Sequence, residues 1–137
     1  MPEFPHSDAQ SNLIYQLRRY RPTFGIRVAP EIRIQITPTR YRVADIAVWR
    51  DDSAGIGIPT HPPCLAIEIL SPEDRMVRVA SKIREYLSIG VEWVWLIDPI
   101  EKACYSHAEP QGVPCTVLRT ENPPIEIPLE KAFDLNA

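Results

Sequence analysis

The sequence has few glycines, no paired cysteine motif and no long apolar run. Its 5 glycines stand against 15 prolines, a ratio that predicts stiff loops. The 3 cysteines form no CxxC pair, so neither a disulfide framework nor a zinc site is indicated. No segment approaches the roughly 18 consecutive apolar residues that span a bilayer, and the N-terminus lacks the basic start and apolar stretch of an export signal. We therefore expect no membrane association and a cytoplasmic location.

An excess of positive charge is also lacking, because the formal net charge is −3. Lys and Arg supply most non-specific affinity for phosphate, so the whole surface is not that of a nucleic-acid binder. Cationic residues still cluster in two segments of the sequence. Each segment is either a solvated helix face or a local contact for nucleic acid. These are Arg18, Arg19 and Arg21, and then Arg75, Arg78, Lys82 and Arg84.

The length and composition fit a single globular unit. The chain has 137 residues, of which 45% are hydrophobic and 24% charged, which suits one hydrophobic core. We therefore expect one domain over residues 1–137.

Hydrophobic periodicity predicts helices alternating with strands. Helices are expected over residues 8–20 with Ser7 as N-cap, from Ser71 and Pro72 to just before Gly90, and near residues 127–133. The expected strands cover residues 32–36, 42–49, 64–70 and 92–98, with shorter ones near 103–107 and 115–119. Residues 50–63 resemble a surface loop. This order predicts an α/β or α+β fold with a central mixed β-sheet flanked by helices.

Two carboxylates interrupt strands that are otherwise apolar. Asp45 follows Ala44 in one strand, and Glu68 stands in the core strand CLAIEIL. A buried ionised carboxylate is costly unless it is paired, hydrogen-bonded or bound to a cation. Lys82 lies at the edge of the apolar arc of the next helix, so its side chain should lean toward the sheet. The three charged groups are therefore expected to meet.

Each of these residues also has a plainer explanation. Asp45 could lie on an exposed strand edge, and Glu68 could form a salt bridge to Lys82 or to an arginine. Lys82 could be a surface lysine whose stem lies along apolar neighbours. Taken together, the three favour a metal site, because Mg²⁺ takes one or two carboxylates, a carbonyl and several waters. Asp45, Glu68 and the backbone carbonyl of Ile69 would make such a set.

The segments RVADIAVW, CLAIEILSPEDR, SKIREYLSIGV and WVWLIDP resemble the Uma-two family of proposed restriction endonucleases, within the PD-(D/E)XK nuclease superfamily. The resemblance runs from about His6 to Phe133. It implies a restriction-endonuclease-like fold and a Mg²⁺-dependent endodeoxyribonuclease, a hydrolase of DNA phosphodiester bonds for which Mn²⁺ substitutes. By that resemblance Asp45 matches the aspartate of the PD pair, Glu68 the central acid, and Lys82 the lysine, moved from the strand to the following helix.

Two positions depart from the superfamily pattern, and two further residues are candidates for an accessory role. Ala44 stands where proline precedes the motif aspartate, and Leu70 stands where many members carry the lysine. Glu31 is either a third acid near the metal or a solvated strand start. His6 matches a histidine often found at this helix start in the family, as a base or phosphate contact, or else is a terminal surface residue.

The sequence leaves a second function open. A catalytically inactive module could keep this fold to bind DNA or a protein partner, since fold alone does not fix function. The three charged positions favour the enzyme, whereas the net negative charge favours the module. Trp49, Trp93 and Trp95 could stack on bases or pack in the core. A homodimer is compatible with either function.

Overall fold

The computed structural model describes residues 3–50 and 57–134, and these residues form a six-stranded main sheet in the order β1-β2-β3-β4-β5-β6. The strands are β1 Ile26–Thr37, β2 Arg40–Arg50, β3 Leu65–Ile69, β4 Trp93–Asp98, β5 Ala103–His107 and β6 Val113–Cys115. Strands β3 and β4 are parallel, whereas the other neighbours are antiparallel. The predicted mixed sheet is therefore confirmed.

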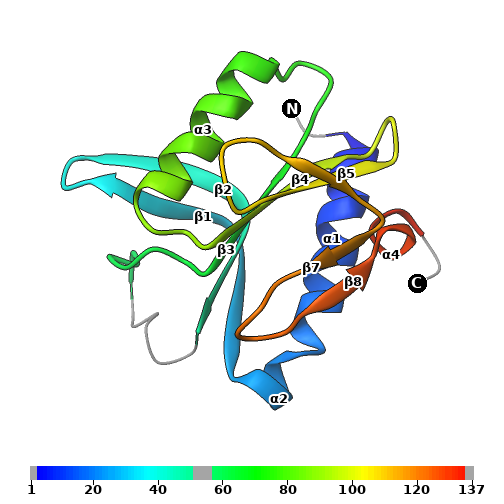
Figure 1. The fold of residues 1–137 in the computed structure, drawn as a ribbon, viewed down its shortest axis with the longest axis horizontal. Helices are drawn as coiled ribbons and strands as arrows, with labels where there is room; N and C mark the ends of the chain where they lie inside the picture. The colour runs from blue at the N-terminus through cyan, green and yellow to red at the C-terminus, as the bar shows by residue number, and fades with distance from the viewer. Residues whose placement is uncertain (1–2, 51–56, 135–137) are drawn as a thin grey trace.

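Helices cover both faces of this sheet (Figure 1). Helix α1 (Phe4–Arg18) packs on one face and α3 (Met76–Ser88) on the other, while α2 (Arg21–Phe24) and α4 (Leu129–Phe133) are short. Successive residues of a strand point to opposite faces, which builds two separate cores. Leu65 and Ile67 join the core beneath α1, whereas Ala66 joins the core beneath α3. None of the helices in the described part of the chain is long and apolar enough to cross a bilayer.

Helix α1 begins earlier than the sequence suggested. It starts at Phe4, with Glu3 in the N-cap position and Pro5 in the first turn. Proline suits a first turn because it has no N–H to leave unpaired there. Ser7 therefore lies inside the helix and is not its cap, so the predicted start near residue 8 is wrong.

Helix α3 begins later than expected, at Met76. The carboxylate Oδ2 of Asp74 accepts hydrogen bonds from the backbone N–H of Ser71 at 2.8 Å and from its hydroxyl at 3.1 Å. These local bonds close a turn that competes with the helix. The predicted start at Ser71 is therefore wrong, whereas Gly90 follows the helix end with a positive φ of 104°, as expected for a glycine cap.

The strand expected near residues 115–119 is divided in two. Strand β6 ends at Cys115 and pairs with β5, whereas β7 (Val117–Arg119) pairs with β8 (Glu126–Pro128) in a separate sheet. Leu118 of β7 is fully buried in the core on the α1 side, which draws the chain away from the main sheet. Residues 57–63 of the expected loop form no helix or strand, and its residues 51–56 lie outside the described residues.

Strands β2 and β3 diverge at the centre of the sheet. They pair only from Ile46 with Ile67 to Val48 with Leu65. The earlier part of β2, from Arg40 up to Ile46, has no ladder to β3 and forms a hairpin with β1 (Figure 1). At this point Ala44 packs in the α3 core and Ile46 in the α1 core, so the usual alternation shifts by one residue at Asp45. We call this opening between β2 and β3 the fork.

Candidate active site

Asp45 closes the inner end of the fork. Its Oδ2 accepts a hydrogen bond from the backbone N–H of Ile69 at 2.7 Å, and its Oδ1 lies 3.4 Å from Nε2 of His6. Burial raises the pKa of Asp45, the Ile69 N–H and His6 oppose this shift, and Glu31 adds to it. The Asp45 carboxylate therefore has nearby groups that stabilise its negative charge, but burial still makes that charge unfavourable.

Glu68 lies on the other arm of the fork and is only 7% exposed. Its Oε1 accepts a hydrogen bond from Nζ of Lys82 at 2.8 Å, and its Oε2 accepts one from the hydroxyl of Tyr86 at 2.9 Å. Burial raises the pKa of Glu68 to about 7, against the opposing effect of the Lys82 ammonium and with a further increase from Asp45. Burial therefore makes the ionised form of Glu68 costly near neutral pH, in spite of its contact with Lys82.

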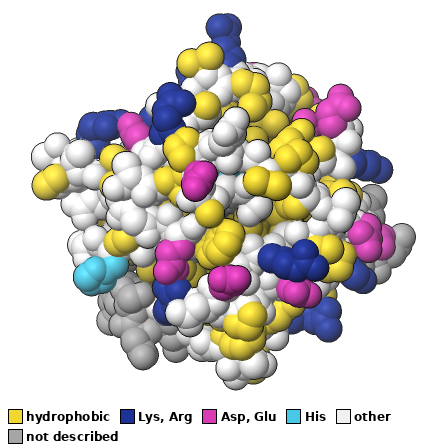
Figure 2. All heavy atoms as spheres, in the orientation of Figure 1, with side chains coloured by type: hydrophobic (Ala, Val, Ile, Leu, Met, Phe, Trp, Pro, Cys, Tyr) yellow, Lys and Arg dark blue, Asp and Glu magenta, His cyan; other side chains and the backbone are white. Residues whose placement is uncertain are grey.

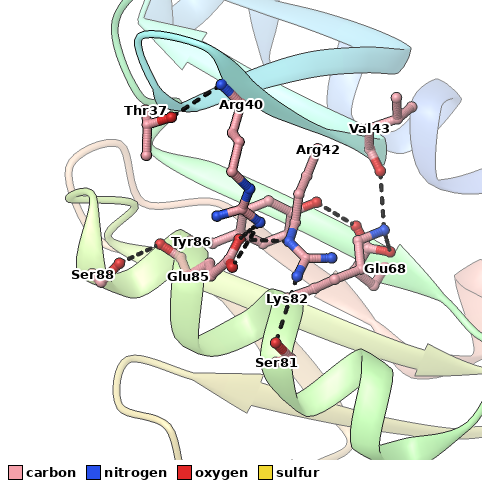
Figure 3. A network of polar contacts seen from close by, with 10 residues as sticks. All are labelled: Thr37, Arg40, Arg42, Val43, Glu68, Ser81, Lys82, Glu85, Tyr86 and Ser88. Atoms are coloured by element: carbon pink, nitrogen blue, oxygen red, sulfur yellow. Dashed lines mark hydrogen bonds and ion pairs between the residues drawn. The ribbon is translucent and has the colours of Figure 1, made fainter.

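Lys82 spans the fork from α3. Its Nζ donates to Glu68 on β3 and, at 3.0 Å, to the backbone carbonyl of Val43 on β2 (Figure 3). That carbonyl lies in the part of β2 that no longer pairs with β3. The side chain points toward the sheet, as the helical arc predicted, and is 19% exposed. The explanation of Lys82 as an ordinary surface lysine is therefore wrong, and so is that of Asp45 on an exposed strand edge, since its side chain is only 18% exposed. The salt bridge from Glu68 to Lys82, which the plainer explanation of Glu68 expected, is present.

Helix α1 supports the site from the opposite face of the sheet. Nε2 of Gln10 donates to the backbone carbonyl of Asp45 at 2.8 Å and to Oε1 of Glu31 at 2.9 Å. Glu31 adopts a positive φ of 48° opposite Asp45. His6 is 7% exposed, because α1 begins before it, so its interpretation as a terminal surface residue is wrong.

A cavity of about 290 Å³ opens at the fork. Its lining includes every residue that the sequence proposed for the site: His6, Glu31, Asp45, Glu68, Ile69 and Lys82. The structure thus brings these residues together, while their chemical roles stay predictions.

Sequence reasoning missed two residues that hold the site in place, Gln10 and Tyr86. Each stands four residues after a candidate on the same helix, Gln10 after His6 and Tyr86 after Lys82. Residues at this spacing lie side by side on a helix, which is the signal that could have found them.

The residues at the fork fit a hard divalent cation. Within residues 3–50 and 57–134, no compact group of three His, Cys, Asp or Glu side chains forms a metal cluster. A set of two carboxylates and a backbone carbonyl with completing waters is nevertheless one that Mg²⁺ uses. Asp45, Glu68 and Ile69 line one cavity, so their oxygen atoms would make up such a set.

A second polar cluster fixes the outer part of the β1–β2 hairpin against α3. Oε2 of Glu85 lies 2.6 Å from Nε of Arg42, and its Oε1 lies 3.1 Å from Nη2 of Arg40 (Figure 3). The hydrogen bond from Arg42 lowers the pKa of Glu85 to about 2, in spite of partial burial. Because the outer hairpin has no ladder to β3, these pairs and Lys82 link it to the rest of the site.

The tryptophans offer little to a nucleic acid. Trp49 and Trp95 are buried in the two cores, and Nε1 of Trp49 donates to the carbonyl of His61 at 2.9 Å. Trp93 is partly buried against the α1 core. The packing interpretation is therefore correct for Trp49 and Trp95, and base stacking on them is excluded.

A mixed sheet flanked by helices, with two acids and a lysine at a strand fork, is the arrangement that the resemblance to restriction endonucleases led us to expect. The chain belongs to the Uma2 family, whose model, described as "Putative restriction endonuclease", matches residues 1–137. The crystal structure of a protein from Anabaena variabilis, described as "a putative nuclease belonging to DUF820", superposes with a TM-score of 0.84. The two are 23% identical, and the match covers 100% of this chain and 84% of that one. No curated protein matches this chain. The expected family and fold class are thereby confirmed.

Proposed function

We propose that this protein is a Mg²⁺-dependent endonuclease that hydrolyses phosphodiester bonds of DNA at the fork. Its membership of a family described as restriction endonucleases supports a nuclease. One observation carries the proposal most strongly: Asp45, Glu68 and Lys82, from three different elements, line the same cavity.

The carboxylates of Asp45 and Glu68 and the carbonyl of Ile69 would hold the metal. When bound, Mg²⁺ lowers the pKa of a water ligand and withdraws charge from the phosphate. Mn²⁺ would substitute, because it accepts the same oxygen ligands. The Ile69 N–H and His6 hold the Asp45 carboxylate in place, and Tyr86 does the same for Glu68.

Lys82 would act on the water and the phosphate. Its ammonium lies against Glu68, and the residue lines the cavity. In the reaction the water gives up a proton to the solvent as its oxygen forms a bond to phosphorus. The bond to the leaving sugar oxygen breaks, and that oxygen takes up a proton from the solvent. Negative charge grows on the phosphate oxygens during this step, and a fixed ammonium stabilises it more than mobile water does.

The direct test is incubation of the protein with supercoiled plasmid, linear duplex, single-stranded DNA and RNA, each with Mg²⁺, Mn²⁺ or EDTA. We expect cleavage of DNA that requires the metal and that Asp45→Asn abolishes. Glu92→Gln is the matched control, because Glu92 is an acid paired with Arg50 on the surface and lies outside the cavity. Cleavage that persists in Asp45→Asn contradicts the assignment, and binding without cleavage identifies the inactive module instead.

A further inference from the structure

The cavity at the fork carries more negative charge than its metal would balance. Among the described residues that line it, five are acids and one is a lysine. The acids are Glu31, Asp45, Glu68, Glu73 and Asp74. A phosphate chain entering such a site is repelled unless other cations stand near the path. A nuclease at this place therefore requires positive groups outside the cavity itself.

Several arginines are already engaged with carboxylates. Arg40 and Arg42 pair with Glu85, and Arg50 pairs with Glu92. In contrast, Arg75 and Arg78 at the start of α3 are exposed and contact no carboxylate among the described residues. Separate dark blue Lys and Arg side chains lie in the upper part of Figure 2, where α3 runs in Figure 1. The start of α3 is thus a place where cations are available to a ligand.

Helix α3 places Arg78 on the same side as Lys82. With about 100° of rotation per residue, Arg78 stands about 40° from Lys82 one turn earlier. Arg75 is the N-cap residue of α3 and has an extended backbone, so it stands just before the helix. Arg75 also directly follows Asp74, which lines the cavity. Arg84 is an exposed arginine of the same helix, but it stands about 200° from Lys82 and faces the other way.

We propose, on the basis of the proposed function, that Arg75 and Arg78 bind the phosphate backbone of the DNA strand that enters the fork. The guanidinium group donates two parallel hydrogen bonds to a phosphate and stays charged at every relevant pH. Contacts of this kind position the strand without reading its sequence. Together with Lys82, they form one row of cations along α3 that leads to the cavity.

The test is the salt dependence of DNA binding, measured by fluorescence anisotropy with a labelled duplex and with Ca²⁺ in place of Mg²⁺ to slow any cleavage. We expect Arg75→Gln and Arg78→Gln each to reduce the slope of log K against log salt by about 0.9, the value for one phosphate contact. Affinity should fall roughly fivefold to tenfold near 0.1 M salt. Arg84→Gln, on the opposite face of the same helix, should behave as the wild type.

Three results would overturn the proposal: equal slopes for Arg75→Gln, Arg78→Gln and the wild type, an equal loss in Arg84→Gln, or no binding of DNA by the wild type. These results do not depend on whether the protein cleaves DNA, because binding is measured without cleavage. If the wild type cleaves DNA and the arginine variants have the slope of the wild type, the nuclease proposal is supported and the proposed phosphate contacts of Arg75 and Arg78 are wrong. If the slopes change and no cleavage occurs, the row serves a binding module.

Discussion

The carboxylate of Asp45 accepts a hydrogen bond from the backbone N–H of Ile69, at 2.7 Å, just beyond the last ladder pair of β2 and β3. The Asp45 side chain thus accepts the hydrogen bond that a backbone carbonyl of the neighbouring strand would accept in a continuous ladder. Removing it in Asp45→Ala would leave a partly buried N–H without an acceptor, which costs about 1–3 kcal/mol. Asn keeps an acceptor at that position while removing the charge, so Asp45→Asn separates the chemical role from the structural one.

Added Mg²⁺ should stabilise the wild-type protein, because a ligand that binds only the folded state raises the free energy of unfolding. The gain is about 2.7 kcal/mol at a concentration 100 times Kd. We expect the rise in Tm to be lost in Asp45→Asn and in Glu68→Gln, and to be kept in the surface control Glu92→Gln. Thermal unfolding with Mg²⁺ and with EDTA measures it, and an equal rise in all four proteins would place the metal elsewhere.

Lys82→Met should separate binding from chemistry. The substitution keeps a long apolar stem but removes the ammonium that contacts Glu68 and the Val43 carbonyl. We expect affinity for metal and for DNA to stay within a few-fold of the wild type, whereas cleavage falls by ~10² or more. Single-turnover cleavage and salt-dependent binding, measured on the same preparations, test this. A loss of DNA affinity with no change in cleavage rate would make Lys82 a simple phosphate contact.

Tyr86→Phe should destabilise the fold. It removes the hydroxyl that donates to the buried Glu68 carboxylate, and a hydrogen bond to a charged group contributes about 1.5–3 kcal/mol. Urea unfolding at pH 8, where Glu68 is mostly ionised, gives the difference. Tyr15→Phe is the control, since Tyr15 is 57% exposed and should change stability by less than about 0.5 kcal/mol. Equal stability of the two variants would mean that Lys82 alone satisfies Glu68.

Glu85→Gln should lower stability at neutral pH and not in strong acid. The pKa of Glu85 is lowered from 4.5 to about 2 by its hydrogen bond from Arg42, so its contribution is full above pH 4.5 and is lost as the pH falls toward 2. Because its side chain is 24% exposed, solvent screening limits the effect to about 1 kcal/mol. Unfolding curves between pH 2 and 7 should therefore converge with the wild type at the acidic end.

The control for this pH dependence is Glu126→Gln. Glu126 pairs with Arg119, but both side chains are 62% exposed, so the ion pair is screened and the curve should follow the wild type. A constant difference between Glu85→Gln and the wild type at every pH would show that Glu85 acts through packing and not through its charge.

The residues that sequence reasoning identified best are charged residues at positions where the pattern predicts apolar ones. Asp45 and Glu68 stand out as acids within apolar strands, and Lys82 as a cation inside an apolar arc. A charged residue within an apolar pattern can be recognised from its sequence neighbours alone. Gln10 is different, because a glutamine on a helix is unremarkable until tertiary packing sets it against Asp45, 35 residues away.

The errors at the helix starts have a related cause. Ser71, Pro72 and Asp74 have the residue types of a helix N-terminus, yet the same serine and aspartate also satisfy each other in a closed turn. Which arrangement forms depends on where the chain must go after β3, and sequence alone does not specify that. In the same way, the path of β7 away from the main sheet follows from burial of Leu118 beneath α1 and α4.

A single ammonium group joins three elements of the fold at the fork. Lys82 comes from α3, and its Nζ donates to Glu68 on β3 and to the Val43 carbonyl on β2, at a place where no backbone ladder joins the two strands. The methylene chain of Lys82 covers the distance from the helix to the strands, so a shorter side chain there would leave both acceptors without this donor. The position of α3 over the sheet and the separation of β2 from β3 are thus coupled through one residue.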